Sequence, residues 1–304
     1  MDYYDDETLK KIQNVELMIL SDFDIFCREH NIDYFLCAGS ALGAVRHGGF
    51  IPWDDDIDVF LLREDYDKFL NFAEKEMSDK YYILDYDHNK DFVLMNAHLC
   101  LKGTKFIPND IKTLEDSGIF LDLFCLDNIS DDPQKAKKQI KKAWTWNKLM
   151  ILSKVKKPVL IMYFGWKKKL MEVILMIVHY MLLLVRITPE HCYKKINYYR
   201  DLYKNEDTDT VGFMFDSTPY MSVLKKSKMY PTKRMMFNGV EANVPHDVKA
   251  YLKHTYGDYM KLPPKEKQHN HVPYRLDFGP YKDCLFKGGR VIRNEKDTDC
   301  ANNI

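Results

Sequence analysis

Residues 38–59 read AGSALGAVRHGGFIPWDDDIDV, and two parts of this stretch decide the fold. In the first part, Gly39 and Ser40 join a short apolar run, Tyr34–Ala38, to the helix-like run ALGAVRH, for which Ser40 is a good N-cap residue. In the second part, four aspartates within residues 54–58 lead into the apolar run Ile57–Leu62. We therefore expect a strand–turn–helix unit followed by a strand that begins in a carboxylate cluster.

The aspartates at 54, 56 and 58 are expected on one face of this strand, because strand side chains alternate, while Asp55 points away. Carboxylates gathered on one face are ligands for a hard divalent ion, Mg²⁺ or Mn²⁺. The alternative is a solvated acidic loop. Trp53 and the apolar run that follows favour half-buried backbone, where carboxylates need a counter-charge or a metal.

The Gly39–Ser40 turn is a candidate phosphate site. Glycine allows the backbone to approach a ligand closely, and a helix N-terminus presents free N–H groups and a positive dipole end. By itself this pattern equally fits an ordinary strand–turn–helix join. The short path to the aspartates favours a joint site in which the turn holds phosphate oxygens and the carboxylates hold the metal.

Asp122 lies inside the apolar pattern IFLDLFCLD of residues 119–127. A lone carboxylate between Leu121 and Leu123 is costly to bury unless it is paired or coordinated, so we expect it to converge on the same metal. An edge-strand aspartate that faces solvent is the alternative. Asp127 reads as a turn residue at the strand end.

The wider pattern predicts an α+β fold with a mixed sheet. Apolar residues at helical spacing predict helices over 6–30 and 65–77. Further strands are expected over 81–84, 92–101 and 119–126. The chain contains no P-loop, Rossmann or hydrolase-elbow motif.

The composition narrows the class of protein. The 304 residues carry 45 Lys and Arg and 45 Asp and Glu, and this zero net charge argues against a nucleic-acid partner. Seven widely spaced cysteines without a C-x-x-C pair support neither a zinc ribbon nor a disulfide framework. With an acidic, polar N-terminal stretch, these features lead us to expect a cytoplasmic protein.

The charge is unevenly distributed. Residues 133–204 hold 17 Lys and Arg and 3 Asp and Glu, a net charge of +14, so the remainder carries −14. The same segment contains the apolar runs 158–166 and 170–187, whose longest stretch free of charged residues is only 13 residues. A core helix, an interfacial helix and a short transmembrane span all fit this pattern, and the basic charge favours the membrane surface.

The run 38–59, together with Arg63-Glu-Asp-Tyr66, closely resembles the LicD family of phosphocholine transferases, which has the nucleotidyltransferase fold; fukutin-related proteins belong to the same wider group. The likeness resumes at 119–127 and near 256–264. It implies a nucleotidyltransferase-like mixed β-sheet core flanked by helices. The expected domains are a catalytic core at 1–132, a basic and apolar helical insertion at 133–205, and a part at 206–304 that completes the catalytic domain.

The resemblance also assigns roles to residues. Gly39 and Ser40 match the phosphate-holding turn, while Asp56 and Asp58 match the metal-binding pair, with Asp54 as an outer member. Asp122 matches the third carboxylate, as acceptor base or metal ligand. On weaker grounds we expect substrate contacts from four basic side chains, Arg46, Lys102, His269 and His271. Where relatives often have a basic residue soon after the two prolines, this chain reads KEKQH at 265–269.

The implied reaction moves phosphocholine from CDP-choline to a hydroxyl of a cell-surface glycan, such as lipopolysaccharide or teichoic acid, and releases CMP. It would depend on Mg²⁺ or Mn²⁺. The acceptor is expected to be lipid-linked, with the enzyme held peripherally at the inner face of the cell membrane. Three alternatives remain open: another CDP-alcohol donor (CDP-ribitol, CDP-glycerol or CDP-ethanolamine), nucleotidyl transfer from an NTP, and a catalytically dead membrane scaffold.

Overall fold

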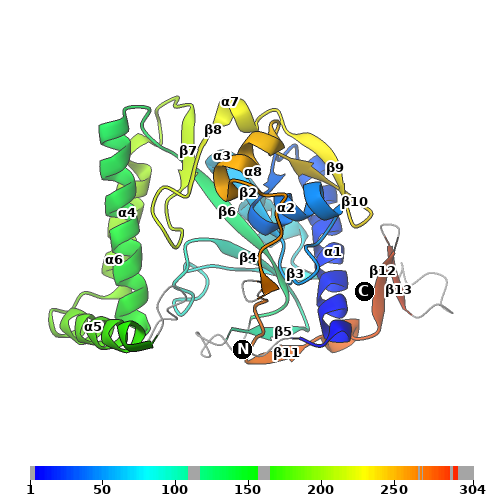
Figure 1. Cartoon of the computed structure of the whole chain (residues 1–304), viewed down its shortest axis with the longest axis horizontal. Helices are drawn as coiled ribbons and strands as arrows, with labels where there is room; N and C mark the ends of the chain where they lie inside the picture. Colours follow the sequence, from blue (N-terminus) through cyan, green and yellow to red (C-terminus); the bar gives the residue numbers. More distant parts are fainter. Residues whose placement is uncertain are drawn as a thin grey trace. The chain divides into compact units, whose positions relative to one another are not determined.

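The computed structural model describes residues 4–108, 117–156, 165–265, 268, 270–287 and 290–293 (Figure 1). Their contacts divide the chain into two compact units. Unit 1 comprises residues 1–84, 96–126 and 226–304, and unit 2 comprises residues 85–95 and 127–225. The predicted insertion at 133–205 falls inside unit 2.

Unit 1 is built on a mixed sheet with strand order β1-β2-β6-β4-β3, which bears out the predicted α+β class. Strands β2 and β6 are parallel, whereas the other three pairs in this order are antiparallel. The strands are β1 (Phe35–Leu36), β2 (Asp58–Leu62), β3 (Tyr81–Leu84), β4 (Ala97–Leu101) and β6 (Phe120–Asn128). β6 begins in unit 1 and ends in unit 2.

Four longer helices pack in unit 1. They are α1 (Asp6–Glu29), α2 (Ala38–His47), α3 (Arg63–Glu76) and α8 (Val248–Tyr256). α3 contacts β2 and β3, and α2 contacts β2 and α8. Phe23 of α1 packs edge-on against Tyr34 and Phe69, and all three rings are fully buried in the core. The periodicity of residues 6–30 and 65–77 is thus confirmed as two amphipathic helices.

The rest of unit 1 consists of α7 and short two-stranded pieces. These elements are β5 (Lys105–Ile107) with β11 (Arg275–Asp277), β9 (Lys233–Phe237) with β10 (Val240–Val244), β12 (Cys284–Lys287) with β13 (Arg290–Arg293), α7 (Lys226–Met229) and η3 (Gly279–Tyr281). Asn238 and Gly239 connect β9 to β10, both with positive φ, as a tight hairpin turn requires. The Asn238 amide oxygen accepts the N–H of Phe50 at 2.7 Å, so this hairpin holds the loop that leads into the aspartates.

The starts of two elements differ most from the sequence prediction, and Asp127, expected as a turn residue, instead lies within β6 and pairs with Gly212 of β7 (Thr210–Phe213). The helix expected to start after Ser40 begins at Ala38, with Cys37 as its N-cap residue. The chain turns at Ala38, whose φ is 44° and whose N–H donates to the Tyr251 hydroxyl at 2.9 Å, so Ser40 is already in the first helical turn. The strand expected from residue 92 begins at Ala97, because residues 85–95 belong to unit 2.

The described residues of unit 2 form three α-helices, a short 3₁₀ helix and a hairpin. They are α4 (Pro133–Lys154), α5 (Gly165–Leu184), α6 (Pro189–Arg200), the short η1 (Asp201–Tyr203), β7 (Thr210–Phe213) and β8 (Ser222–Lys225). Asp132 and Thr188 cap α4 and α6, each followed by a proline at the helix start. α4 packs against both α5 and α6, and β7 pairs with the end of β6 at Asp127 and Asn128.

Among the helices of the described residues, none is both long and apolar enough to cross a bilayer by itself. Gly165–Leu184 and Pro189–Tyr203 meet that test only as a pair, bent by 97°. The six described cysteines are free and buried, and Cys300 lies outside the described residues.

Candidate active site

The candidate site is an acidic cluster where two neighbouring strands of unit 1 begin. Asp58 is the first residue of β2, and its register partner on the parallel strand β6 is Asp122. Oxygens of Asp56, Asp58 and Asp122, one from each carboxylate, lie within 4.8 Å of one another. This arrangement fits a divalent cation, because Mg²⁺ and Mn²⁺ prefer several carboxylate oxygens.

Burial and mutual repulsion both act on these carboxyl groups. Burial, reinforced by Asp56, Asp122 and Asp54, raises the pKa of Asp58 well above its usual value. Burial also raises the pKa of Asp56 to about 6 and that of Asp54 to about 8. A cation bound among these carboxylates would relieve this unfavourable charge.

Gly39 and Ser40 lie beside the cluster and contact its backbone and side chains. The Ser40 hydroxyl, 2% exposed, accepts the backbone N–H of Asp58 at 2.9 Å. A Cβ atom on Gly39 would stand 2.6 Å from an Asp54 carboxylate oxygen, so a larger residue here would displace the Asp54 side chain. The structure thus gives the Ser40 hydroxyl a positioning contact, and its predicted phosphate contact stays a prediction.

Asp55, in the non-strand segment before β2, has a different partner. Both of its carboxylate oxygens accept the backbone N–H of His271, at 2.9 and 3.0 Å, and Asp55 is 1% exposed. The His271 ring nitrogen Nδ1 lies 3.1 Å from Asp55 and 3.4 Å from Asp56. The hydrogen bond to Asp55 is the main cause that raises the pKa of His271 to about 10. His271 therefore places a positive charge against the cluster.

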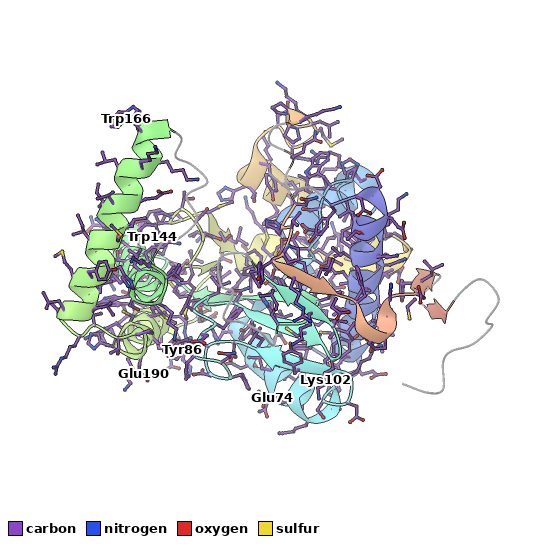
Figure 2. All side chains as sticks on the ribbon, turned by 90° about the horizontal axis from the view of Figure 1, so that it is seen from below. Glu74, Tyr86, Lys102, Trp144, Trp166 and Glu190 are labelled. Atoms are coloured by element: carbon purple, nitrogen blue, oxygen red, sulfur yellow. The ribbon has the colours of Figure 1, made fainter. Side chains whose placement is uncertain are left out.

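The other predicted basic residues have different positions. Arg46, in the last turn of α2, donates to the Tyr259 carbonyl at 2.9 Å, and the Asp54 charge acts on it. Lys102, labelled in Figure 2, is exposed and donates to the Ser78 carbonyl; the described residues show no contact between Lys102 and the aspartates. The structure therefore does not bring Lys102 to the site. His269 lies outside the described residues.

Asn96, just before β4, and His98, in β4, hold Asp122, and no sequence pattern indicated either residue. His98, the antiparallel register partner of Asp122, places its Nε2 3.0 Å from the carboxylate. The Asn96 side chain donates to the same oxygen at 2.5 Å. The His98 ring stacks on Phe120 with centroids 3.8 Å apart. These contacts fix the orientation of Asp122 for work as a base or a ligand.

Helix α1 adds another missed carboxylate. Glu16 is 3% exposed, and one of its oxygens has no hydrogen-bond partner among the described residues. Burial, followed by the charges of Asp56, Asp55 and Asp54, raises its pKa well above the usual range. The sequence does contain a sign of this burial: Glu16 lies on the apolar stripe of α1, one turn after Ile12 and one turn before Ile19, where a buried side chain is expected. From the same helix, Gln13 donates to the Asp54 carbonyl at 2.8 Å.

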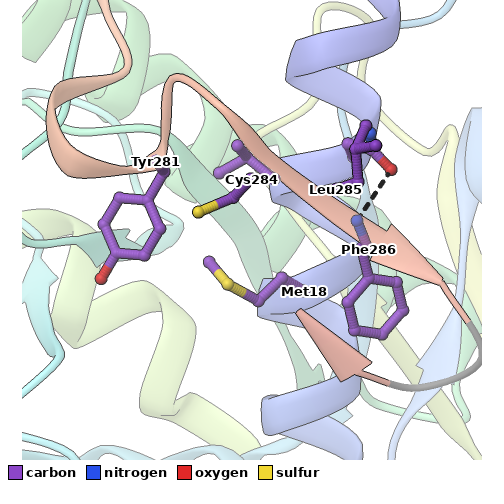
Figure 3. Close-up of a pocket in the computed structure, with 7 residues that line it drawn as sticks. Met18, Tyr281, Cys284, Leu285 and Phe286 are labelled. Atoms are coloured by element: carbon purple, nitrogen blue, oxygen red, sulfur yellow. Dashed lines mark hydrogen bonds between the residues drawn. The ribbon is translucent and has the colours of Figure 1, made fainter. Parts of the chain in front are cut away.

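A small pocket elsewhere in unit 1 lies between α1 and the segment 281–286 (Figure 3). Met18, Tyr281 and Cys284 line it, and the Phe286 N–H donates to Asn14 at 3.3 Å. It contains no residue of the acidic cluster and offers no group suited to phosphate or metal. The candidate active site therefore rests on the carboxylate geometry.

Comparison with known proteins gives two findings. Residues 31–160 match the family model described as the LicD/FKTN/FKRP nucleotidyltransferase domain. The chain is 27% identical over 270 residues to the lipopolysaccharide cholinephosphotransferase LicD of Haemophilus influenzae, a match that spans 87% of this chain and 96% of that protein. A shorter match, 36% identical over 76 residues, joins a quarter of the chain to an uncharacterised protein of Rickettsia typhi.

Proposed function

Because this chain belongs to the LicD family, we propose that it transfers phosphocholine, or a similar alcohol phosphate, from a CDP-alcohol to a glycan hydroxyl. The observation that carries this proposal is the convergence of Asp58 and Asp122, on two parallel strands, with Asp56 from the segment before β2. The name of the Haemophilus influenzae relative supports choline as the head group and lipopolysaccharide as the acceptor.

The donor set suits Mg²⁺ or Mn²⁺. Asp56, Asp58 and Asp122 would hold the metal, with Asp54 in an outer position behind Gly39. When bound, the metal would supply neutralising charge for the donor diphosphate and for the CMP that leaves. The raised pKa values of Asp54, Asp56 and Asp58 support this assignment, since such carboxylates gain most from a cation.

In the reaction we propose, a glycan hydroxyl oxygen attacks the phosphorus that carries the alcohol. A new P–O bond forms to the glycan, the P–O bond to CMP breaks in line, and CMP leaves with the electron pair. The hydroxyl proton passes to Asp122 or, if Asp122 acts as a ligand, to solvent. In either case the contacts from His98 and Asn96 keep the Asp122 carboxylate aimed at the cluster.

The head group is set by the walls of the site. Choline is a quaternary ammonium, which aromatic faces bind well. Tyr256, at the end of α8, is 39% exposed, and burial together with the charges of Asp58, Asp54 and Asp56 raises its pKa. Its ring is therefore a candidate wall for the choline methyl groups, whereas a polyol donor would use polar side chains.

We place the reaction in the cytoplasm, on a lipid-linked glycan at the inner face of the cell membrane. The basic and apolar character of residues 133–204 supports this location. A lipid-linked acceptor would reach the enzyme by diffusion in the membrane plane.

A donor panel tests the proposal. The purified chain, with Mg²⁺ and a lipopolysaccharide or teichoic acid acceptor, is given CDP-choline, CDP-ethanolamine, CDP-glycerol, CDP-ribitol, CTP or ATP. We expect CMP release to be fastest with CDP-choline and to vanish with EDTA. Release of pyrophosphate from an NTP would instead identify a nucleotidyltransferase. No turnover of any donor, with Mg²⁺ binding also absent, would contradict the assignment of the carboxylates.

A further inference from the structure

Helix α5 of unit 2 exposes an unusual amount of apolar surface. Trp166 is 70% exposed, Ile177 52% and Leu184 83%, and Figure 2 shows Trp166 near one end of the helix. Only two residues of α5, His179 and Leu182, are buried. His179 donates a hydrogen bond from Nδ1 to the Leu152 carbonyl, 2.7 Å away, so the buried side of α5 is fixed on the end of α4.

Apart from Leu183, the exposed apolar residues of α5 form one stripe. At 100° per residue they fall within an arc of about 120° along the whole helix. We call this stripe the α5 face; it consists of Trp166, Leu170, Val173, Ile174, Ile177, Tyr180, Met181 and Leu184. A helix of a globular domain normally turns such a stripe toward the core, whereas α5 turns it outward.

Lysine side chains border the α5 face. The Lys167 ammonium lies over the Trp166 ring, 6.0 Å from its centroid, and the Lys156 ammonium lies over the Tyr180 ring at 5.0 Å. Lys168 and Lys169 follow in the first turns, and Glu172 is the one acidic residue of the helix. Each of the two aromatic rings of the face, Trp166 and Tyr180, thus has a lysine ammonium over it, and the two rings lie near opposite ends of α5.

We propose that the α5 face docks on the surface of an anionic lipid bilayer, with α5 lying in the interface. Apolar side chains would enter the acyl boundary, Trp166 and Tyr180 would sit at headgroup depth, and the lysines would bind lipid phosphates. The lysines beside the stripe favour an anionic lipid surface as the partner. A protein partner or a second copy of the chain would cover the apolar stripe without needing cations along it. This inference is independent of the proposed chemistry.

The test is sedimentation of the full chain with two kinds of vesicle, phosphatidylcholine alone and phosphatidylcholine mixed with phosphatidylglycerol, at low and high salt. The test variant is Ile177→Glu, at the centre of the face. Its matched control is Met236→Glu, because Met236 of β9 is exposed to a similar degree, 49% against 52%. A Lys167→Ala/Lys168→Ala/Lys169→Ala variant tests the charge.

We expect wild type and Met236→Glu to bind anionic vesicles much more strongly than neutral ones. Ile177→Glu should lower the partition coefficient at least about tenfold, the effect of losing one buried aliphatic side chain. The lysine variant should lose most of its preference for anionic vesicles. Failure of the wild type to bind, or equal binding by Ile177→Glu, overturns the proposal. A dimer in solution that Ile177→Glu dissociates also overturns it, because the occupant is then a second copy.

Discussion

Asp58 and Asp122 are direct register partners on the adjacent parallel strands β2 and β6. Partners in a parallel pair point to the same side of the sheet, so the backbone alone forces two carboxylates together. Such a pair is unfavourable in a protein without a cation and favourable with one. The sheet therefore holds an electrostatic cost that a bound cation would remove.

The first prediction follows from this cost. Asp58→Asn and Asp122→Asn should each lower the rate of CMP release on the order of 10³-fold, as loss of a metal ligand does. Without metal, Asp58→Asn should raise the Tm, because burial and like charges raise the pKa of Asp58 in the folded state. Asp67→Asn is the control, since Asp67 is a surface residue that pairs with Arg63. Calorimetry and a CMP assay measure both effects. A loss of activity with a lower Tm would point to structural damage instead.

The second prediction concerns pH. The folded-state pKa values of Asp54 and Asp56 lie near 8 and 6, above their usual 3.8, so the folded chain binds more protons than the unfolded chain. Their contribution is then fully present below pH 3.8 and is lost as the pH rises through 6 and 8. In EDTA, this contribution should lower the Tm as the pH rises across that window. Saturating Mg²⁺ should flatten the slope, which a series of thermal melts would show. An identical slope with and without Mg²⁺ would speak against a metal at this cluster.

Many of the helices and strands that position the aspartates could be predicted from residue patterns. The periodicity of residues 6–30 and the alternation around Asp122 each specify a local structure, and both are confirmed by α1 and β6. The strand predicted over 92–101 is present only over 97–101, because the buried apolar residues Phe92 and Val93 in a non-strand segment give the same signal as a strand. The predicted start of α2 was wrong because the contact that turns the chain at Ala38 comes from Tyr251, more than 200 positions away, and local sequence does not indicate such a contact.

The supporting residues of the site were harder to predict. His98 and Asn96 look like ordinary polar residues until the antiparallel pairing of β4 with β6 puts them beside Asp122. The Asn238–Gly239 dipeptide, in contrast, is a recognisable hairpin signal, but its hold on Phe50 is a tertiary contact. Local sequence thus predicts the aspartates of the cluster, and pairing between distant segments supplies the groups that orient Asp122.

The third prediction separates two roles for Ser40. Ser40→Ala removes the acceptor of the Asp58 N–H and leaves that buried group unsatisfied, at a cost of about 1–3 kcal/mol in the free energy of unfolding. If Ser40 acts by positioning Asp58, kcat should fall more than the KM for the donor rises. Ser153→Ala is the control, because Ser153 is also buried but only donates to a carbonyl within α4. A large rise in KM with unchanged stability would instead indicate a direct phosphate contact.

The fourth prediction concerns the cation that faces the cluster. His271→Ala removes the positive charge 3.4 Å from Asp56 and keeps the two backbone bonds to Asp55. Repulsion among the aspartates should then grow, so the Tm in EDTA should fall and the increase in Tm on adding Mg²⁺ should be larger than in wild type. His246→Ala serves as control, because the His246 ring bonds to the Pro231 carbonyl, away from the aspartates. An unchanged response to Mg²⁺ would show that His271 does not share the electrostatic field of the metal site.

The last prediction tests what holds α1 against the β9–β10 hairpin. Asp24 of α1, 3% exposed, accepts hydrogen bonds from Arg234, Tyr34 and Arg28. Burial acts to raise the pKa of Asp24, and these hydrogen bonds, with that from Arg234 the largest, hold it below 3.8 instead. Arg234→Met removes the guanidinium charge that balances the buried Asp24 carboxylate. It should therefore lower the free energy of unfolding by about 3 kcal/mol.

Arg28→Met is the matched control, because Arg28 contacts the same carboxylate from a side chain that is 60% exposed, where an ion pair contributes at most about 1 kcal/mol. The lowered pKa of Asp24 means that its contribution is present above pH 3.8 and is lost as the pH falls through the folded-state value. The difference between wild type and Arg234→Met in urea unfolding should therefore shrink in acid. Equal losses from the two arginine variants, constant with pH, would show that the buried ion pair does not anchor the hairpin.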